Sequence, residues 1–306
     1  MSLNIIFMGT PEFSVPILKT INNSNHKILE VYTQPPKKKN RGQKINLSPV
    51  HQYSLENKLQ VRHPENIDTT DEFEYIKRLN PDLVLVVAYG QIIPSKWLNI
   101  ENIKFINIHA SLLPKWRGAA PIQRAIMNLD KETGISIMKI VEKLDAGPIM
   151  MRKSIKILRD TTYEELKRNL SDLGSKMTVE ALKLIEKNED KFFPQIEKEA
   201  TYAKKIKKEE SKINWKNSAE KIIANINALS PNPGAWFEYN GSRIKIIKAE
   251  EVKEKGKPGE ILKNSFIISC QTNAIQVLEV QKEGKKRMNI NEYLKGNFFK
   301  IGDFVE

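Results

Sequence analysis

The stretch Leu83-Val84-Leu85-Val86-Val87-Ala88 is an unbroken apolar run near the middle of the first half of the chain. A strand that is apolar on both faces is typical of the centre of a parallel sheet covered by helices on both sides. The run is far too short to span a bilayer, which takes about 20 apolar residues in a helix. It therefore predicts the central strand of an α/β sheet.

Strand-like and helix-like segments alternate on either side of this run. Gly9 ends a short apolar segment that begins near the N-terminus, and Thr162 and Glu165 form a capping-box pattern that opens a helix. Alternation of this kind predicts a doubly wound, Rossmann-like parallel sheet. The expected strands are 4–8, 27–32, 104–108, 135–141 and 149–158, and the expected helices are 11–21, 72–79, 122–129 and 162–185.

The last third of the chain has a different pattern. A charged segment with Pro194 and no clear periodicity is expected to be a linker. A helix at 219–229 and short strands follow it, with Asn240-Gly241 as a hairpin turn. We therefore expect a smaller OB-like β-barrel as the second domain. The predicted division is 1–188, 189–205 and 206–306, with barrel strands at 235–239, 243–248, 266–270 and 274–280.

Composition excludes several classes of protein. The single cysteine, Cys270, rules out an internal disulfide framework and a cysteine-based metal site. The four histidines have no metal-ligand spacing, so no metal is expected. Strand-like sequence begins at Asn4, which leaves no room for a signal peptide. We expect a cytoplasmic protein.

Net charge suggests a polyanionic partner. The formal charge is +13 at pH 7, and residues 201–306 hold 20 basic and 13 acidic side chains. A positive field spread over the whole chain is typical of nucleic-acid binding. A generally lysine-rich composition gives the same number, so charge alone leaves both interpretations open.

The candidate catalytic residues lie at the ends of predicted strands. The first strand and turn carry no G-x-G-x-x-G and no G-x-x-x-x-G-K-[ST], which disfavours a dinucleotide or nucleoside triphosphate site. Asn107 and His109 end a predicted strand and share one face of it. Asn can stabilise an oxyanion, and His can move a proton near neutral pH. A structural role for both residues stays open at this point.

Asp145 lies in the turn Leu144-Asp145-Ala146-Gly147-Pro148 between two later strands. Alone it has the pattern of an ordinary turn aspartate. A carboxylate placed beside His109 would orient the imidazole, so the hypothesis of a catalytic centre includes it.

The segment that follows the second strand is strongly basic. Between Gln34-Pro35-Pro36 and Ile45 it offers five cations in eight residues and no apolar residue. We expect a surface loop without regular structure that binds phosphates, or merely a solvated face. The cations are Lys37, Lys38, Lys39, Arg41 and Lys44.

The stretch from Asn107 to Ile122, which reads NIHASLLPKWRGAAPI, closely resembles the signature of the methionyl-tRNA formyltransferase family. Other folate-dependent formyltransferases share Asn-x-His-x-Ser-Leu-Leu-Pro, whereas Trp116-Arg117-Gly118-Ala119-Ala120-Pro121, the basic segment and the C-terminal part single out the tRNA enzymes. The resemblance runs in order over essentially the whole chain. Met8 to Phe13, Ala88-Tyr89-Gly90, Leu144 to Pro148 and Pro231 to Ala235 also carry it.

The resemblance implies a function and its residues. It implies transfer of a formyl group from 10-formyltetrahydrofolate to the α-amine of methionine on initiator Met-tRNA, by a bacterial, cytoplasmic, monomeric enzyme without a metal or a membrane partner. It assigns catalysis to Asn107, His109 and Asp145, folate binding to Ser111, Leu112, Leu113 and Pro114, and tRNA binding to Arg41 and the neighbouring lysines 37, 38, 39 and 44.

Two positions depart from the family pattern, and two rival functions remain. Pro36 stands where the family usually has Asp, and Asn227 stands where it often has Arg. One rival is a non-catalytic RNA-binding protein, which predicts a broken catalytic trio. The other is a formyltransferase for a small amine, such as a purine precursor or an amino sugar, which would not need a positively charged second domain.

Overall fold

The computed structural model describes residues 2–39 and 44–306, which divide into two compact units. The chain passes between the units more than once, so each unit is described by itself. The predicted boundaries at 188 and 206 stay a prediction. The first unit comprises Met1–Gly118, Thr133–Ile155 and Lys167–Tyr202, and the second comprises Ala119–Glu132, Lys156–Leu166 and Ala203–Glu306.

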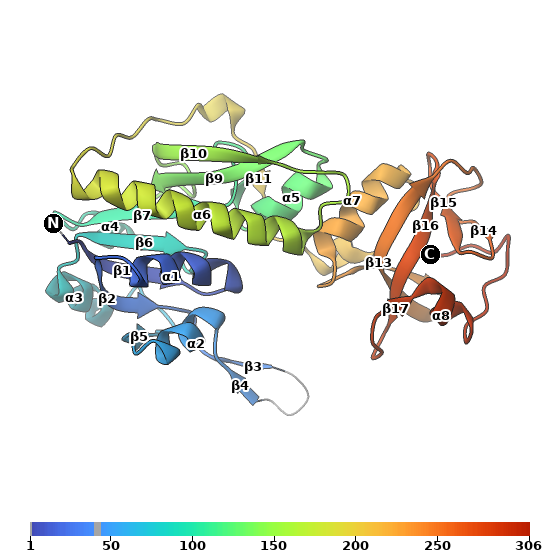
Figure 1. Cartoon of the computed structure of the whole chain (residues 1–306), viewed down its shortest axis with the longest axis horizontal. Coiled ribbons are helices and arrows are strands. Elements are labelled where there is room, and N and C mark those ends of the chain that lie inside the picture. The colour runs from blue at the N-terminus through green and yellow to red at the C-terminus, as the bar shows by residue number, and fades with distance from the viewer. Residues whose placement is uncertain (1, 40–43) are drawn as a thin grey trace. The chain divides into compact units, whose positions relative to one another are not determined.

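A seven-stranded sheet forms the centre of the first unit, in the order β10-β9-β7-β6-β1-β2-β5 (Figure 1). Strand β6 (Leu83–Val87) is buried along its whole length, as the apolar run predicts. The strand order reverses beside β1, and this doubly wound arrangement confirms the predicted fold class. The other strands are β1 (Asn4–Gly9), β2 (Lys27–Tyr32), β5 (Val61–Arg62), β7 (Lys104–His109), β9 (Glu132–Lys139) and β10 (Ile149–Lys156).

Five neighbouring strands of this sheet are parallel, but the strand beside β7 is not. Strand β9 pairs with β7 in the antiparallel sense, with Asn107 opposite Met138 and His109 opposite Ser136. Antiparallel strands on an otherwise parallel sheet are common in doubly wound folds. Strand β9 therefore begins beside His109 and ends with Lys139 opposite Ile106, where the connection to β10 starts.

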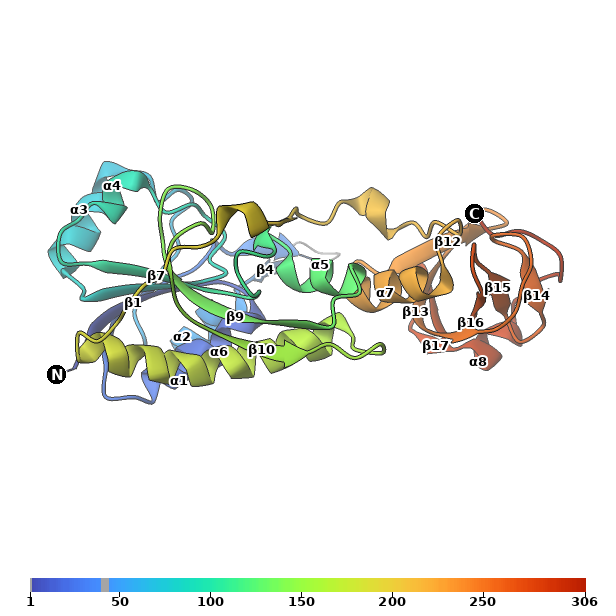
Figure 2. The same cartoon turned by 90° about the horizontal axis from the view of Figure 1, so that it is seen from above.

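Helices cover both faces of this sheet (Figure 2). On one face, Ile76 and Trp97 pack with the even-numbered side chains Ile6 and Val84 in a buried apolar cluster. On the other face, Gly174 lets its helix approach Ile17 and Ile108 closely. The alternation of side chains along the strands divides the core in this way. The helices of this unit are α1 (Val15–Asn22), α2 (Pro49–Glu56), α3 (Thr70–Leu79), α4 (Ser95–Leu98) and most of α6 (Tyr163–Glu186).

Helix starts follow the local capping chemistry. The Thr69 hydroxyl accepts a hydrogen bond from the backbone N–H of Glu72 at the start of α3. At the start of α6, Thr162 and Glu165 each accept from the other's backbone N–H, which is the predicted capping box. Helix α2 is absent from the elements predicted above, although Ser48 followed by Pro49 is a helix-start signal.

The basic segment has regular structure at both of its ends. Strand β3 (Lys37–Lys39) pairs with β4 (Lys44–Asn46) in an antiparallel ladder. The expectation that this whole segment lacks regular structure is therefore wrong for these residues. Backbone hydrogen bonds between the two strands need no apolar anchor, which is the physical reason.

The second unit is built on an antiparallel sheet in the order β12-β13-β16-β15-β14, with β17 paired to β16. Irregular register between β13 and β16 next to Lys248 increases the local twist and curls the sheet. This curled sheet confirms the prediction of a β-barrel-like second domain. The strands are β12 (Ala235–Tyr239), β13 (Ser242–Val252), β14 (Ile261–Lys263), β15 (Ile267–Ser269), β16 (Ala274–Lys282) and β17 (Met288–Asn289).

An aromatic cluster fills the curl. The Phe266 ring lies 4.2 Å from the Phe299 ring and 5.9 Å from the Phe237 ring, measured between centroids. The predicted hairpin between β12 and β13 is present, with positive φ at Asn240 and Gly241. The helices of this unit are α5 (Pro121–Met127), α7 (Ala219–Leu229) and α8 (Ile290–Leu294).

Among the described residues, no helix combines the length and the apolar character that crossing a membrane requires.

The buried thiol of Cys270 gives a test of the second unit. The residue is 2% exposed, and burial raises its thiol pKa to about 12. Only the thiolate reacts with disulfide reagents, so at pH 8 the native protein should react roughly a thousandfold more slowly than an exposed cysteine. The measurement is the rate of thiol modification with and without denaturant. Equal rates in the two conditions would contradict this packing.

Candidate active site

Three segments of the first unit meet at the carboxyl end of β7. Asn107 and His109 project from the same face of that strand, as the alternation predicts. The turn between β9 and β10 brings Asp145 to both of them. Asn107 Nδ2 donates to Asp145 Oδ1 at 3.4 Å, and His109 Nδ1 lies 3.7 Å from Asp145 Oδ2. The structure therefore brings together the three side chains that the sequence analysis gives as catalytic candidates.

The Asp145 carboxylate is held most firmly by a backbone group. The N–H of Gly118 donates to Asp145 Oδ2 at 2.8 Å. The side chains of Asp145 and His109 are only 9% and 8% exposed. A carboxylate taken out of water needs such donors, because each one offsets part of its lost hydration.

The orientation of the His109 ring follows from its second partner. His109 Nε2 lies 2.9 Å from the carbonyl oxygen of Trp116. A carbonyl can only accept, so Nε2 carries a hydrogen in this arrangement. Nδ1 then faces the Asp145 carboxylate.

Close backbone packing fixes the turn that carries Asp145. Asp145 has a φ of +50°, in the left-handed region that Asp tolerates better than most residues. A Cβ on Gly147 would lie 1.8 Å from the carbonyl oxygen of Lys139, so only glycine fits there. The turn therefore has little freedom to move the carboxylate.

The tetrapeptide Ser111–Pro114 forms the loop that leaves β7. The side chains of Ser111 and Leu113 are completely buried, whereas Leu112 is half-buried. Ser136 Oγ donates to the carbonyl of Ser111 and accepts from the N–H of Leu113. The buried side chains hold the loop, so a bound ligand would meet Leu112 and the loop backbone.

Sequence reasoning missed the backbone groups of residues 116–118. The carbonyl of Trp116 meets His109, and the N–H of Gly118 meets Asp145. Gly118 has a φ of +115°, a conformation that favours glycine, so the glycine was the available signal. Arg117 between them is fully buried, which no local pattern of a charged residue would indicate.

The predicted tRNA-binding residues are only partly described. Lys37 is exposed in β3. Lys38 and Lys39 also lie in β3, and Lys44 lies in β4. Arg41 lies outside the described residues.

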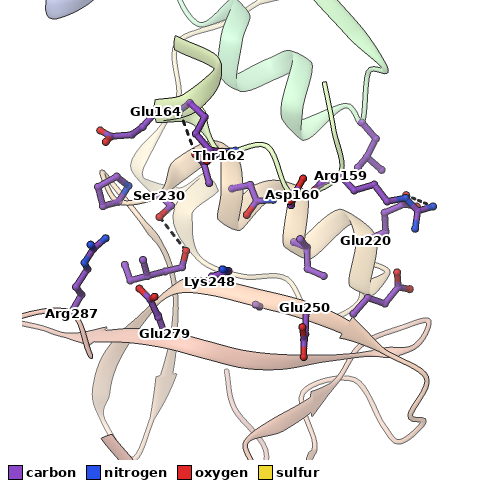
Figure 3. Close-up of a pocket in the computed structure, with 18 residues that line it drawn as sticks. Arg159, Asp160, Thr162, Glu164, Glu220, Ser230, Lys248, Glu250, Glu279 and Arg287 are labelled. Atoms are coloured by element: carbon purple, nitrogen blue, oxygen red, sulfur yellow. Dashed lines mark hydrogen bonds and ion pairs between the residues drawn. The ribbon is translucent and has the colours of Figure 1, made fainter. Parts of the chain in front are cut away.

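A cavity of about 500 Å³ lies within the second unit (Figure 3). Asn107, His109 and Asp145 are not among its lining residues. Asn227 is, and it donates to the carbonyl of Arg159 at 3.3 Å. With seven carboxylates and three cations, the lining is unfavourable for the phosphates of RNA. The charged lining residues are Asp160, Glu164, Glu165, Glu220, Glu250, Glu251 and Glu279, with Arg159, Lys248 and Arg287.

A second hollow in the same unit has the opposite charge. Its cations outnumber its carboxylates by four to two, and Trp236 is part of its wall. The guanidinium of Arg243 lies 3.8 Å from the centre of the Trp236 ring. The basic hollow is lined by Lys208, Arg243, Lys245 and Lys282, with Glu209 and Glu283.

Family models match both parts of the chain. Residues 3–182 match the model described as formyl transferase, and residues 205–297 match the model described as formyl transferase, C-terminal domain.

Named relatives cover nearly the whole chain. The methionyl-tRNA formyltransferase of Pelagibacter ubique is 50% identical over 299 residues, which are 97% of this chain and 96% of the relative. That of Caldanaerobacter subterraneus is 43% identical, over 99% of this chain and 100% of the relative. An N-formyltransferase from Helicobacter canadensis, solved with folinic acid and dTDP-3-aminofucose, has the same fold. It aligns with a TM-score of 0.69 at 22% identity, over 92% of this chain and 99% of that one.

Because Gly147 lies so close to the Lys139 carbonyl, adding one methyl group there should lower both stability and activity. Gly147→Ala should lower the stability of the first unit by about 1–3 kcal/mol, because the Lys139 carbonyl must move. It should also lower activity, because the same shift displaces Asp145. Thermal unfolding and turnover should be measured on one preparation. Gly296→Ala is the matched control, since nothing lies within 4 Å of its added Cβ, and equal behaviour of the two variants would contradict the packing.

Proposed function

The chain belongs to the methionyl-tRNA formyltransferase family, and we propose that Asn107, His109 and Asp145 are the residues with which it performs that family's reaction. The enzyme formylates the methionine carried by initiator tRNA. The observation that carries the assignment is the meeting of the Asp145 carboxylate with Asn107, His109 and the Gly118 N–H in one buried cluster.

We propose 10-formyltetrahydrofolate as the formyl donor. The α-amine of methionine attacks the formyl carbon, and a tetrahedral intermediate forms with negative charge on the former carbonyl oxygen. The new C–N bond is retained, the bond to the folate nitrogen breaks, and the proton lost by the amine balances the one gained by that nitrogen. The reaction therefore needs a donor for the oxyanion and a group that moves protons.

The three side chains divide these tasks. The second N–H of the Asn107 amide is available to the developing oxyanion. His109 accepts the proton of the amine at Nδ1 and returns it to the folate nitrogen. Asp145, which lies 3.7 Å from Nδ1, orients the imidazole ring. The Gly118 N–H keeps the carboxylate in place throughout.

We propose that the folate lies against the Ser111–Pro114 loop and the end of β6. Ala88 and Gly90 are exposed directly after β6, and β6 is the neighbour of β7. Ligands of doubly wound sheets bind beyond the carboxyl ends of such strands. The Helicobacter canadensis enzyme of the same fold was solved with folinic acid, which supports a folate donor.

The tRNA would meet basic surfaces in both units. In the first unit these are Arg41 and lysines 37, 38, 39 and 44. In the second unit the basic hollow at Arg243 and Trp236 suits a phosphate backbone beside a stacked base. We further propose that the enzyme is a monomer and acts in the cytoplasm.

Amino-sugar formylation is the main rival, since an N-formyltransferase solved in complex with dTDP-3-aminofucose shares the fold. The likeness to that enzyme is 22% identity, against 50% to a methionyl-tRNA formyltransferase. A sugar-specific enzyme also has no use for a net charge of +13. The deciding experiment offers the purified protein 10-formyltetrahydrofolate with Met-tRNA, a dTDP-amino sugar or glycinamide ribonucleotide. Formylation of either small amine in preference to Met-tRNA would overturn the proposal.

Truncation of each catalytic side chain should lower turnover without unfolding the protein. Asn107→Ala, His109→Ala and Asp145→Ala should each reduce kcat by about 10²–10³-fold, the usual cost of one lost oxyanion or proton-transfer group. Single-turnover formylation of Met-tRNA measures the effect, and circular dichroism checks the fold. Near-normal turnover of the His109 variant would contradict the assignment.

In the basic segment, Arg41 should make directed contacts with the tRNA, and the lysines should add general electrostatic attraction to its phosphates. The guanidinium of an arginine can donate two hydrogen bonds to one phosphate or stack on a base, whereas a lysine ammonium acts mainly as a point charge. Arg41→Ala should therefore lower kcat/KM for Met-tRNA more than Lys38→Ala does, and Arg41→Lys should not restore it fully. Each lost phosphate contact should reduce the log–log salt slope by roughly one unit or less.

Arg243→Ala, in the second unit, extends the same salt series to the basic hollow. If the basic hollow binds RNA, this variant should also weaken tRNA binding and leave single-turnover kcat unchanged. Identical behaviour of the Arg41 and Lys38 variants would mean that the segment acts only as a diffuse positive field.

A further inference from the structure

The side-chain amide of Gln195 is hydrogen-bonded on both of its sides. Its Oε1 accepts from Arg117 Nε at 3.1 Å and from Arg117 Nη2 at 2.9 Å. Its Nε2 donates to the carbonyl of Asp145 at 2.8 Å and to the carbonyl of Gly147 at 2.7 Å. Arginine can only donate and a carbonyl can only accept, so this environment determines which way the amide faces.

The two carbonyls belong to the turn that carries the proposed catalytic carboxylate. Asp145 has a positive φ, which side-chain-bearing residues adopt less readily than glycine, so its backbone benefits from an external clamp. Gln195 supplies that clamp by bonding the turn both at Asp145 and two residues later. The direction of the Asp145 side chain depends on this backbone.

Arg117 connects the clamp to the other side of the catalytic cluster. Its guanidinium is completely buried, and its Nη1 donates to Glu197 Oε2 at 3.0 Å. Lys143 and Arg117 together hold the pKa of the Glu197 carboxyl below its ordinary value, so Glu197 stays charged. The peptide groups on either side of Arg117 are those that meet His109 and Asp145. One arginine thus ties its own loop to the turn through Gln195.

The segment that carries Gln195 is bound to the first unit along its length. Phe193 exchanges two backbone hydrogen bonds with Ile149. Thr201 accepts from the N–H of Trp116 through its hydroxyl and from the N–H of Arg117 through its carbonyl. The sequence indicates only a linker here, yet these contacts place a defined side chain against the catalytic turn.

We propose that Gln195 is a positioning residue, which fixes the backbone of the 145–147 turn so that Asp145 meets His109 and Asn107 in the reacting geometry. This inference rests on the proposed function of Asp145. Gln195 acts through that residue and does not touch the reacting groups.

Gln195→Glu is the most direct test, because it preserves the shape of the side chain and its bond to Arg117. The change places a second acceptor oxygen against the two turn carbonyls, which then repel it. A displacement of the catalytic group by about 1 Å can cost on the order of 10²-fold in rate. We expect kcat for formylation of Met-tRNA to fall about 10- to 100-fold, with little change in KM for either substrate.

Two further variants separate positioning from simple loss of structure. Gln195→Met removes both sets of hydrogen bonds without adding charge, and it should lower kcat in the same direction. Glu199→Gln makes the reverse exchange of carboxylate for amide at an exposed residue of the same segment, and kcat should stay unchanged. In parallel thermal unfolding, Gln195→Glu and Glu199→Gln should show small shifts, whereas Gln195→Met should be less stable because it leaves two buried N–H groups of Arg117 without their acceptor.

The decisive comparison combines Gln195→Glu with Asp145→Ala. If Gln195 acts through Asp145, the double variant should have the kcat of Asp145→Ala alone, since residues that act as a unit are not additive. An undiminished kcat for Gln195→Glu, a change confined to KM, or a full additional loss in the double variant would overturn the inference. Normal turnover of Asp145→Ala itself would instead overturn the proposed catalytic centre, and the inference with it.

Discussion

The hydrogen bond from the Gly118 N–H to the Asp145 carboxylate, 2.8 Å long, is the interaction on which the geometry of the site depends. It joins the loop that follows β7 to the turn between β9 and β10. Asn107 and His109 on β7 complete the cluster around the same carboxylate. A donor held by the backbone is well suited to this task, because it cannot rotate away when the side chains engage a substrate.

The fold supplies this meeting point through the connection between β9 and β10. Strand β9 runs antiparallel to β7, with Ser136 opposite His109 and Lys139 opposite Ile106, so β9 ends away from His109. The connecting residues 140–148 then return along β7 and bring Asp145 to Asn107 and His109. Glycines at 134 and 147 make the close approach possible, since a Cβ at either position would collide with a backbone carbonyl. The precision of the site therefore comes from backbone packing.

Charge is distributed unevenly within the second unit. Carboxylates outnumber cations by seven to three around the cavity of Figure 3, whereas cations outnumber carboxylates by four to two around the basic hollow at Arg243. The net charge of +13 therefore does not indicate the local charge around an individual cavity. For a polyanionic substrate such an arrangement gives orientation as well as attraction, because one surface of the unit favours phosphate and another disfavours it.

The sequence by itself determined the local features: the central strand at Leu83–Val87, the capping box at Thr162, the Asn240-Gly241 hairpin and the identity of the three catalytic candidates. The first three follow from residues within a few positions of one another, whereas Asp145 lies 38 positions after Asn107 and is assigned with it by the family resemblance. The bond between Arg117 and Gln195 joins residues 78 positions apart, and the carbonyl of the buried Ser111 accepts from Ser136, 25 positions away. Only the tertiary structure decided these contacts and the direction of β9. The reason is that packing between distant segments selects them, and no periodicity or turn chemistry in the local sequence encodes that choice.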